Sequence, residues 1–165
     1  MRIGIISDTH GVLRPEVAQL FQGVEHILHA GDIGGRDVIR RLEAIAPVTF
    51  VPGNVDGVED AVERLEIGGL RILLTHILPR PGAAGKHVAS SLRDRPADLV
   101  IFGHSHLPHD ELIDGVHYFN PASAGPRRFD YPVSAGLIED GVLRHCALDE
   151  RSVAALGRRM NQLTA

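Results

Sequence analysis

The 165-residue sequence contains very little cysteine and few aromatic residues. Cys146 is its only cysteine, tryptophan is absent, and aromatic residues make up 4% of the chain. A single cysteine cannot form an internal disulfide, and it excludes a zinc site built from several thiolates. No apolar run approaches the roughly 18–20 residues that span a bilayer, and no charged-then-apolar leader opens the chain. We therefore expect a cytoplasmic protein.

The chain also lacks a strong charge of one sign. Its formal net charge is −4, and no long run of like charges occurs. This pattern gives neither the basic track of a nucleic-acid-binding protein nor the basic helix of a membrane-surface protein. An apolar fraction of 44% beside 23% charged residues is typical of a globular chain. The length predicts a single domain over residues 1–165.

Short apolar runs alternate with helical patterns in the first third of the chain. The runs at 2–7, 24–32 and 48–54 predict strands, because each is short and bounded by turn residues. Apolar residues at helical spacing predict helices near 15–21 and over 36–45. Strands that alternate with helices of this size indicate βαβ units and a largely parallel sheet.

The remainder of the chain is rich in hairpin signals. Gly68-Gly69, Asp114-Gly115 and Asp140-Gly141 each separate two apolar runs. We expect a helix over about 84–93, a strand within 98–106, and a helical tail from Asp149 to about Leu163. Together these elements predict an α/β fold of two packed mixed β-sheets flanked by helices, an αββα sandwich.

Metal-binding side chains follow five of the predicted strands, at the point where each strand ends. Alone, each has a local interpretation: Asp32 as a helix cap, Asn54 as a turn residue, His76 as a hydrogen-bonded core histidine. Local roles do not explain why all five strand ends carry such residues. Ligands bind at the carboxyl ends of strands in α/β sheets. We therefore predict a metal site formed by Asp8, His10, Asp32, Asn54, His76, His104 and His106.

In order, these motifs are Asp-x-His, Gly-Asp, Gly-Asn, Thr-His and Gly-His-x-His, and they lie within residues 2 to about 128. The set resembles the calcineurin-like metallophosphoesterases, and most closely their small single-domain phosphodiesterase branch. The resemblance implies that two metals lie at the edge of the sandwich. It assigns Asp8, His10 and His106 to the first metal. It assigns Asn54, His76 and His104 to the second, with Asp32 as the bridge.

The implied reaction is the hydrolysis of a phosphate diester by a hydroxide that bridges the two metals. Asp32, Asn54 and His76 would take part in catalysis through this hydroxide, and no side chain acts as the nucleophile. Oxygen and imidazole ligands without thiolate suit Mn²⁺ first, with Ni, Zn, Fe or Co as alternatives. Two divalent ions beside two carboxylates leave a surplus charge of about +2, which attracts an anionic ester.

The expected substrate is a small, nucleotide-like phosphodiester. A phosphomonoesterase with the same site and a non-catalytic protein-interaction scaffold of the same fold are the alternatives. Whether the chain forms a homo-oligomer stays open. Three arginines, Arg80, Arg127 and Arg128, are candidates for binding the substrate's phosphate, because guanidinium groups match phosphate oxygens. Each is equally well explained as a solvated surface charge.

The sequence departs from the pattern of the family in three places. Val55 stands where many members have a histidine after Gly-Asn, which argues against strong monoesterase activity. Ile77, Pro79 and Pro81 replace the usual residues after Thr-His and are expected to reshape that loop. Ala122 stands where related sequences have glycine, so a positive φ there would strain the backbone. The other histidines receive no role in the site: His26, His29, His87, His109, His117 and His145.

Overall fold

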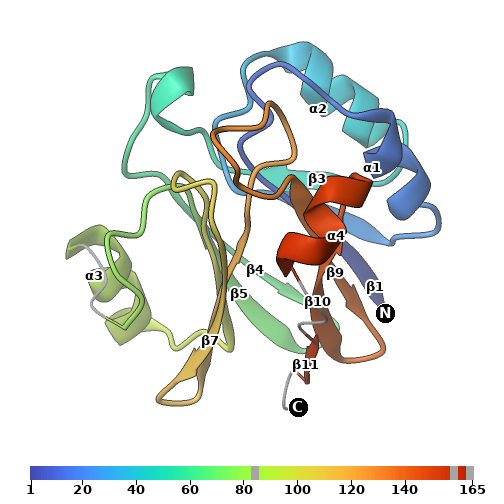
Figure 1. Cartoon of the computed structure of the whole chain (residues 1–165). Coiled ribbons are helices and arrows are strands. Elements are labelled where there is room, and N and C mark those ends of the chain that lie inside the picture. The colour runs from blue at the N-terminus through green and yellow to red at the C-terminus, as the bar shows by residue number, and fades with distance from the viewer. Residues whose placement is uncertain (83–85, 157–159, 163–165) are drawn as a thin grey trace.

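In this computed structural model, which describes residues 1–82, 86–156 and 160–162, two β-sheets pack face to face with helices on their outer sides (Figure 1). Among the described residues, the first sheet has six strands in the order β11-β10-β9-β1-β2-β3. The second has five, in the order β4-β5-β6-β8-β7. The predicted α/β sandwich of two mixed sheets is confirmed.

The first sheet is parallel at one side and antiparallel at the other. β1 pairs with β2 and β2 with β3 in parallel, whereas β9 pairs antiparallel with both β1 and β10. The strands are β1 (Arg2–Ile6), β2 (His26–His29), β3 (Val48–Phe50), β9 (Ser134–Glu139), β10 (Val142–Ala147) and β11 (Met160–Gln162).

The second sheet has a parallel centre with an antiparallel strand at each edge. β5, β6 and β8 run in parallel, and β4 and β7 close the two edges through hairpins. The strands are β4 (Val62–Ile67), β5 (Leu70–Thr75), β6 (Leu99–Ile101), β7 (Pro108–Ile113) and β8 (Val116–Pro121).

The three predicted hairpins are confirmed. In each, both turn residues have the positive φ that a two-residue type I′ turn requires. The φ values are 58° and 84° at Gly68-Gly69, 50° and 80° at Asp114-Gly115, and 51° and 78° at Asp140-Gly141. Aspartate tolerates this region better than most residues, and the glycine after it meets no steric barrier.

The helices are short. They are α1 (Pro15–Leu20), α2 (Arg36–Glu43), α3 (Lys86–Asp94) and α4 (Glu150–Leu156), with a 3₁₀ turn, η1, at Asn54–Asp56. Pro15 occupies the first turn of α1, where its missing N–H would be unpaired in any case. None of the described helices is long and apolar enough to cross a bilayer.

The expectation of a helical tail is wrong in its second half. The helix α4 ends at Leu156, and Met160–Gln162 form the strand β11 against β10. Helical composition was a weak signal here, because the free edge of β10 offers unpaired backbone groups that a short segment of almost any composition can satisfy. Residues 157–159 and 163–165 lie outside the described residues.

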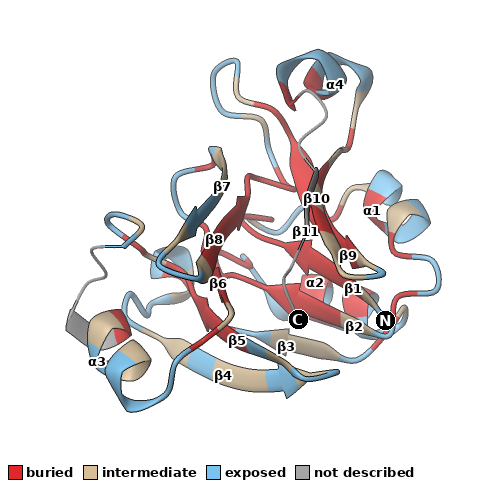
Figure 2. Cartoon of the chain, turned by 90° about the horizontal axis from the view of Figure 1, so that it is seen from below, coloured by how far each residue is buried: buried red, intermediate tan, exposed pale blue. Residues whose placement is uncertain are grey.

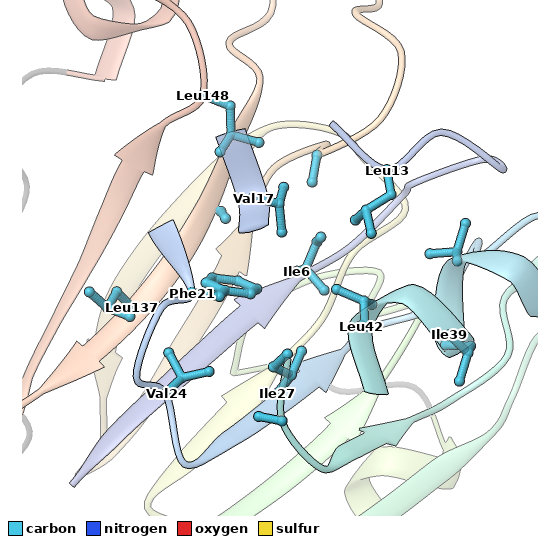
Figure 3. Close-up of a cluster of buried hydrophobic side chains, with 14 of the residues drawn as sticks. Ile6, Leu13, Val17, Phe21, Val24, Ile27, Ile39, Leu42, Leu137 and Leu148 are labelled. Carbon is cyan, nitrogen blue, oxygen red and sulfur yellow. The ribbon is translucent and has the colours of Figure 1, made fainter. Parts of the chain in front are cut away.

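Buried apolar side chains form one layer between the sheets and one on each outer face. Most of the central strands are accordingly buried, as the red colour in Figure 2 shows. Along β5, Ile72 and Leu74 face the first sheet, whereas Leu73 faces α3, as the period of two in a strand requires. On the other outer face, Figure 3 shows Val17 and Leu42 packed over Ile6 of β1. This packing fixes the strand ends from which the loops of the site emerge.

Ala122, directly after β8, has a φ of 66° and a fully buried side chain. Its N–H donates to the side-chain Oδ1 of Asn120 at 2.9 Å, which holds the turn in place. The strain expected at this position is therefore present. A left-handed conformation costs a residue with a Cβ roughly 1–2 kcal/mol relative to the right-handed one.

Replacing Ala122 with glycine should relieve this strain, while the same change at Ala124, equally buried but without a positive φ, should only remove a methyl group. We expect Ala122→Gly to be more stable than Ala124→Gly by about 1–2 kcal/mol in urea unfolding. Equal losses in the two variants would show that the turn is not strained.

Candidate metal centre

All seven predicted residues lie in the loops after β1, β2, β3, β5 and β6, and short distances between their side chains bring them together. One group of three comes from the β1 and β6 loops. His106 Nε2 lies 3.2 Å from Asp8 Oδ1 and 3.2 Å from His10 Nε2. His10 Nε2 lies 4.0 Å from the same Asp8 oxygen. These three donors could hold one ion.

A second group of three comes from the loops after β3, β5 and β6. Asn54 Oδ1 lies 3.2 Å from His76 Nε2 and 3.1 Å from His104 Nδ1. His76 Nδ1 donates a hydrogen bond to the carbonyl of Ala30 at 2.7 Å. In the neutral ring this bond leaves the lone pair on Nε2, which faces the group. A hydrogen bond on the far nitrogen is typical of metal-binding histidines.

Asp32 lies between the two groups. Its Oδ2 is 3.6 Å from His10 Nε2 in the first group, and its Oδ1 is 3.2 Å from His76 Nε2 in the second. Oδ1 also accepts a hydrogen bond from the N–H of Val55 at 3.0 Å. One carboxylate therefore faces both groups of donors.

The donor set fits a cation. Asp8, Asp32, His76 and His106 are all at most 3% exposed, so the centre has a buried floor, while Asn54 and His104 lie at its exposed rim. Asp8 Oδ1 is buried, and no described hydrogen-bond donor is aligned with it. Carboxylate and imidazole lone pairs that converge without hydrogens between them repel one another, and a bound cation removes that repulsion.

Five of the seven side chains sit on left-handed backbone. The φ angles are 54° at Asp8, 47° at His10, 53° at Asp32, 70° at His104 and 58° at His106. Backbone hydrogen bonds hold the loops in this form: the N–H of Asp8 donates to Gly31 O at 3.0 Å, and that of His10 to Asp32 O at 2.9 Å. Strained residues of this kind concentrate at functional sites.

Glycines next to the predicted ligands leave room for them. A Cβ at Gly53 would lie 2.3 Å from Asp32 Oδ1, and one at Gly103 would lie 2.8 Å from Asp8 Oδ2 and 2.0 Å from Ser7 Oγ. No side chain fits at these distances. Gly53 and Gly103 are therefore required because the side chains of Asp32 and Asp8 lie directly against them.

Asp8 is held in part by Ser7, to which the sequence analysis gave no role. Its Oδ2 accepts hydrogen bonds from Ser7 Oγ at 2.7 Å and from the backbone N–H of His104 at 3.1 Å. Burial alone would raise the pKa of Asp8, but the His106 imidazole and the Ser7 hydroxyl outweigh it and hold this pKa below its usual value. Asp8 is therefore a carboxylate at neutral pH. Ser7 is next to Asp8 in the chain, but no pattern distinguished it.

Asp56 joins the loops that carry Asp32 and Asn54. Its carboxylate accepts N–H groups from Ile33 at 2.9 Å, Gly34 at 3.0 Å and Gly53 at 2.9 Å. Burial acts to raise its pKa, but these three hydrogen bonds prevail and lower it. Its place two residues after Asn54 is the only sequence signal for this role.

His29 lies under the centre and is completely buried. Its Nδ1 accepts the N–H of Gly31 at 3.2 Å, so its Nε2–H donates to Thr9 Oγ1 at 2.9 Å. Thr9 Oγ1 in turn donates to Ile33 O at 3.0 Å. Burial lowers the pKa of His29 to about 4, so it is neutral under ordinary conditions. It links the β1 and β2 loops through hydrogen bonds.

The three candidate arginines have different surroundings. Arg127 donates to Tyr131 O at 2.6 Å, Asp149 Oδ2 at 2.5 Å and Ser152 Oγ at 3.2 Å, so it joins its loop to α4. Arg128 is exposed, and Arg80 is exposed in the loop after β5.

Arg128 lies within electrostatic reach of the first group of donors. Burial is the main cause of a lowered pKa at His10, and Asp32 and Asp8 oppose it. The positive charge of Arg128 makes a smaller contribution in the same direction as burial.

The other described histidines bond elsewhere. His26 pairs with Thr49 Oγ1 at 2.8 Å, His117 with Asp110 at 3.0 Å, and His145 Nε2 donates to Asn120 O at 2.7 Å. His109 Nε2 lies 3.3 Å from a carboxylate oxygen of Glu111. The side chain of His87 lies outside the described residues.

The loop after His76 is attached to the second sheet. Leu78 is 9% exposed and packs in the outer apolar layer with Tyr118, whose hydroxyl interacts with the N–H of Gly82. Pro79 and Arg80 between these anchors are exposed. The unusual residues of this loop therefore lie between two fixed points in its described part.

The family model and the curated relatives that match this chain are all named as phosphoesterases. Residues 1–140 match the calcineurin-like phosphoesterase superfamily domain. A protein of Methanothermobacter thermautotrophicus named probable metallophosphoesterase is 37% identical over 150 residues, which cover 86% of this chain and 87% of that protein. Phosphodiesterase YfcE of Escherichia coli K12 is 27% identical over 183 residues, with coverage of 94% of this chain and 96% of the relative.

The fold also occurs in solved structures. Wild-type Vps29 of Entamoeba histolytica, in complex with Zn²⁺, matches with a TM-score of 0.75 at 22% identity, over 99% of this chain and 100% of that chain. At this level of identity, the likeness shows the fold alone.

The buried neutral state of His29 has a consequence for stability. Between pH 6.5 and about 4 the unfolded chain binds a proton at this residue that the native chain does not, so stability falls as the pH falls. We expect His29→Gln to remove about 2 kcal/mol of the loss between pH 7 and pH 5 in urea unfolding of chelator-treated protein. The same pH dependence in both proteins would exclude a depressed pKa at His29.

Proposed function

Because the chain belongs to the calcineurin-like phosphoesterase superfamily, we propose that residues 1–165 form a single-domain, two-metal-dependent phosphodiesterase. The observation that carries this proposal is the placement of two groups of donors on either side of Asp32. The first ion would be held by Asp8, His10 and His106, and the second by Asn54, His76 and His104. Asp32 would bridge them. When bound, the two cations supply an activated water and stabilise negative charge on the phosphoryl oxygens.

The donor set supports Mn²⁺ as the first choice of metal. It combines carboxylate, amide and imidazole groups, and the one cysteine, Cys146, is not among them. Ions of intermediate hardness prefer such mixtures, so Ni, Zn, Fe and Co are the alternatives.

The remaining residues of the centre orient the ligands. Ser7 and the N–H of His104 fix the Asp8 carboxylate, and the N–H of Val55 fixes Asp32. Such outer contacts commonly change metal affinity or activity 10- to 100-fold when removed. Asp56 acts on the ligands indirectly, because it accepts hydrogen bonds from the backbones of the two loops that carry Asp32 and Asn54.

The surroundings of Asn54 favour a diester over a monoester substrate. Val55 is 50% exposed and offers no proton to a leaving group. Asp56 is held as a carboxylate by three N–H groups, so it is not available as an acid either. A diester with a good leaving group needs less help from an acid than a monoester with a poor one.

Positive side chains at the rim complete the proposed substrate site. Arg128 is exposed and its charge helps to lower the pKa of His10, and Arg80 is exposed in the loop after His76. Either guanidinium could bind a non-bridging phosphate oxygen. The contacts of Arg127 support a different role, in holding the loop that carries Arg128.

The experiments below also test two alternatives to a phosphodiesterase. A phosphomonoesterase would use the same donors on a different ester. The likeness to Vps29 keeps a protein-interaction scaffold as the second alternative, since the same fold serves proteins of different function.

The first experiment measures hydrolysis of bis(p-nitrophenyl) phosphate and of p-nitrophenyl phosphate. Chelator-stripped protein should be inactive and should recover on addition of Mn²⁺, Ni²⁺ or Zn²⁺, with the diester preferred. His76→Ala should lose more than about 100-fold in turnover, beyond the effect of removing an outer contact. Asp32→Ala should lose most, since both ions depend on it.

The matched control is His26→Ala, because His26 opens β2, at the end of the strand away from the centre, and bonds to Thr49 Oγ1. It should keep full activity. Folded wild-type protein that hydrolyses neither ester with any metal would favour the scaffold, and a preference for the monoester would favour the monoesterase.

A second experiment separates the arginines. Arg128→Gln and Arg80→Gln should each raise the KM for the diester about tenfold, because a charge-assisted hydrogen bond to phosphate is lost. Arg127→Gln should instead lower the stability in urea by about 1–3 kcal/mol. Arg40→Gln, an exposed arginine of α2 paired with Asp37, is the control and should change neither quantity. Unchanged KM in the first two variants would remove them from the substrate site.

A further inference from the structure

Phe129 combines two unfavourable features in one residue. It is 83% exposed, the largest exposed fraction among the described large apolar side chains, and its φ is 51°. An apolar ring in water is unfavourable, and a bulky residue with positive φ is a true outlier. A residue that retains both features calls for an explanation in function.

The other strained positions already have explanations. Nine described residues other than glycine have positive φ. Five are the proposed ligands, Asp114 and Asp140 form hairpin turns, and Ala122 begins the turn after β8. Phe129 lies in a turn as well, closed by the backbone of Arg128 and Tyr131, but the turn does not explain the residue type. Glycine, asparagine or aspartate adopts a positive φ with less strain than phenylalanine.

The loop that carries Phe129 starts against the candidate metal centre. Ser123 Oγ donates to Asp8 O at 3.0 Å, and a Cβ on Gly125 would lie 2.3 Å from Thr9 O, so the two segments are in direct contact. In Figure 1 this orange segment lies beside the blue loop after β1. The neighbour of Phe129 in sequence, Arg128, acts electrostatically on His10.

The same loop is braced on its other side. Tyr131 N donates to Arg128 O at 3.0 Å, which closes the turn around Phe129. Arg127 joins the turn to Asp149 and Ser152, and the rings of Phe129 and Tyr131 meet edge to face with centroids 5.5 Å apart. The aromatic ring is therefore held in place although water surrounds it.

We propose that Phe129 is an aromatic platform for a flat ring attached to the substrate's phosphate, so that the preferred substrate is a phosphodiester of a nucleobase-bearing alcohol. This inference rests on the proposed function, since the phosphate would lie at the candidate metal centre. Arg128 would face the phosphate, and Phe129 would stack on the base. Stacking on an exposed, fixed ring tolerates any base, because every base has a π-face.

The test compares two ligands that share a phosphate but differ in the ring. Calorimetry measures the binding of adenosine 5′-monophosphate and of methyl phosphate to Mn²⁺-loaded protein. We expect the nucleotide to bind about tenfold more tightly or better, and Phe129→Ala to remove this preference. Phe129→Trp should keep it, and Leu112→Ala, a control at an exposed apolar residue of β7, should leave it unchanged.

Equal affinity for the two ligands in the wild type, binding of neither, or a preference that survives Phe129→Ala would overturn the inference. A change in oligomeric state in Phe129→Ala, with the nucleotide preference intact, would assign the ring to contact with another chain instead. Hydrolysis of bis(p-nitrophenyl) phosphate, measured in parallel, keeps the two proposals apart. Hydrolysis without nucleotide preference removes the platform alone, whereas absence of hydrolysis removes the proposed phosphodiesterase.

Discussion

The structure depends on holding five polar residues in left-handed backbone at one edge of a sandwich. At roughly 1–2 kcal/mol each, these conformations together cost about 5–10 kcal/mol, which is as large as the net stability of many domains. Asp and His accept this region better than most residues, which places the cost toward the lower figure. The buried layer between the sheets and the hydrogen bonds between the β1 and β2 loops offset it. The loops are rigid because each one supports its neighbour.

The fold by itself does not decide between catalysis and protein binding. A relative named phosphodiesterase and a solved structure of Vps29 both match this chain over nearly its whole length. What bears on the choice is the set of side chains at the strand ends, where two carboxylates and several imidazoles converge. A hydrolase that relies on metal ions needs such a set of donors, whereas protein binding does not require it.

Much of the fold could be predicted because local signals agreed with it. The Gly-Gly and Asp-Gly pairs set the hairpins, and the strand ends located the polar residues that the structure brings together. The C-terminal segment was predicted as a helix from its composition, but part of it pairs with β10 as a strand. The sequence does not show which strand will have a free edge. The tasks of Asp56 and Arg127 could not be predicted either. Each depends on contacts between loops that are distant along the chain, as between Arg127 and Asp149.

The contact between Arg127 and α4 extends beyond the part of the chain that matches the family. The match ends at residue 140, yet Asp149 and Ser152 fix the loop that carries Arg128 and Phe129. The loop is therefore held from outside the matched range, whereas the seven polar residues are held from within it. Substitutions in the C-terminal helix can reshape the rim while the inner cluster stays constant. A lineage can thereby diversify in what it recognises, and its chemistry need not be rebuilt each time.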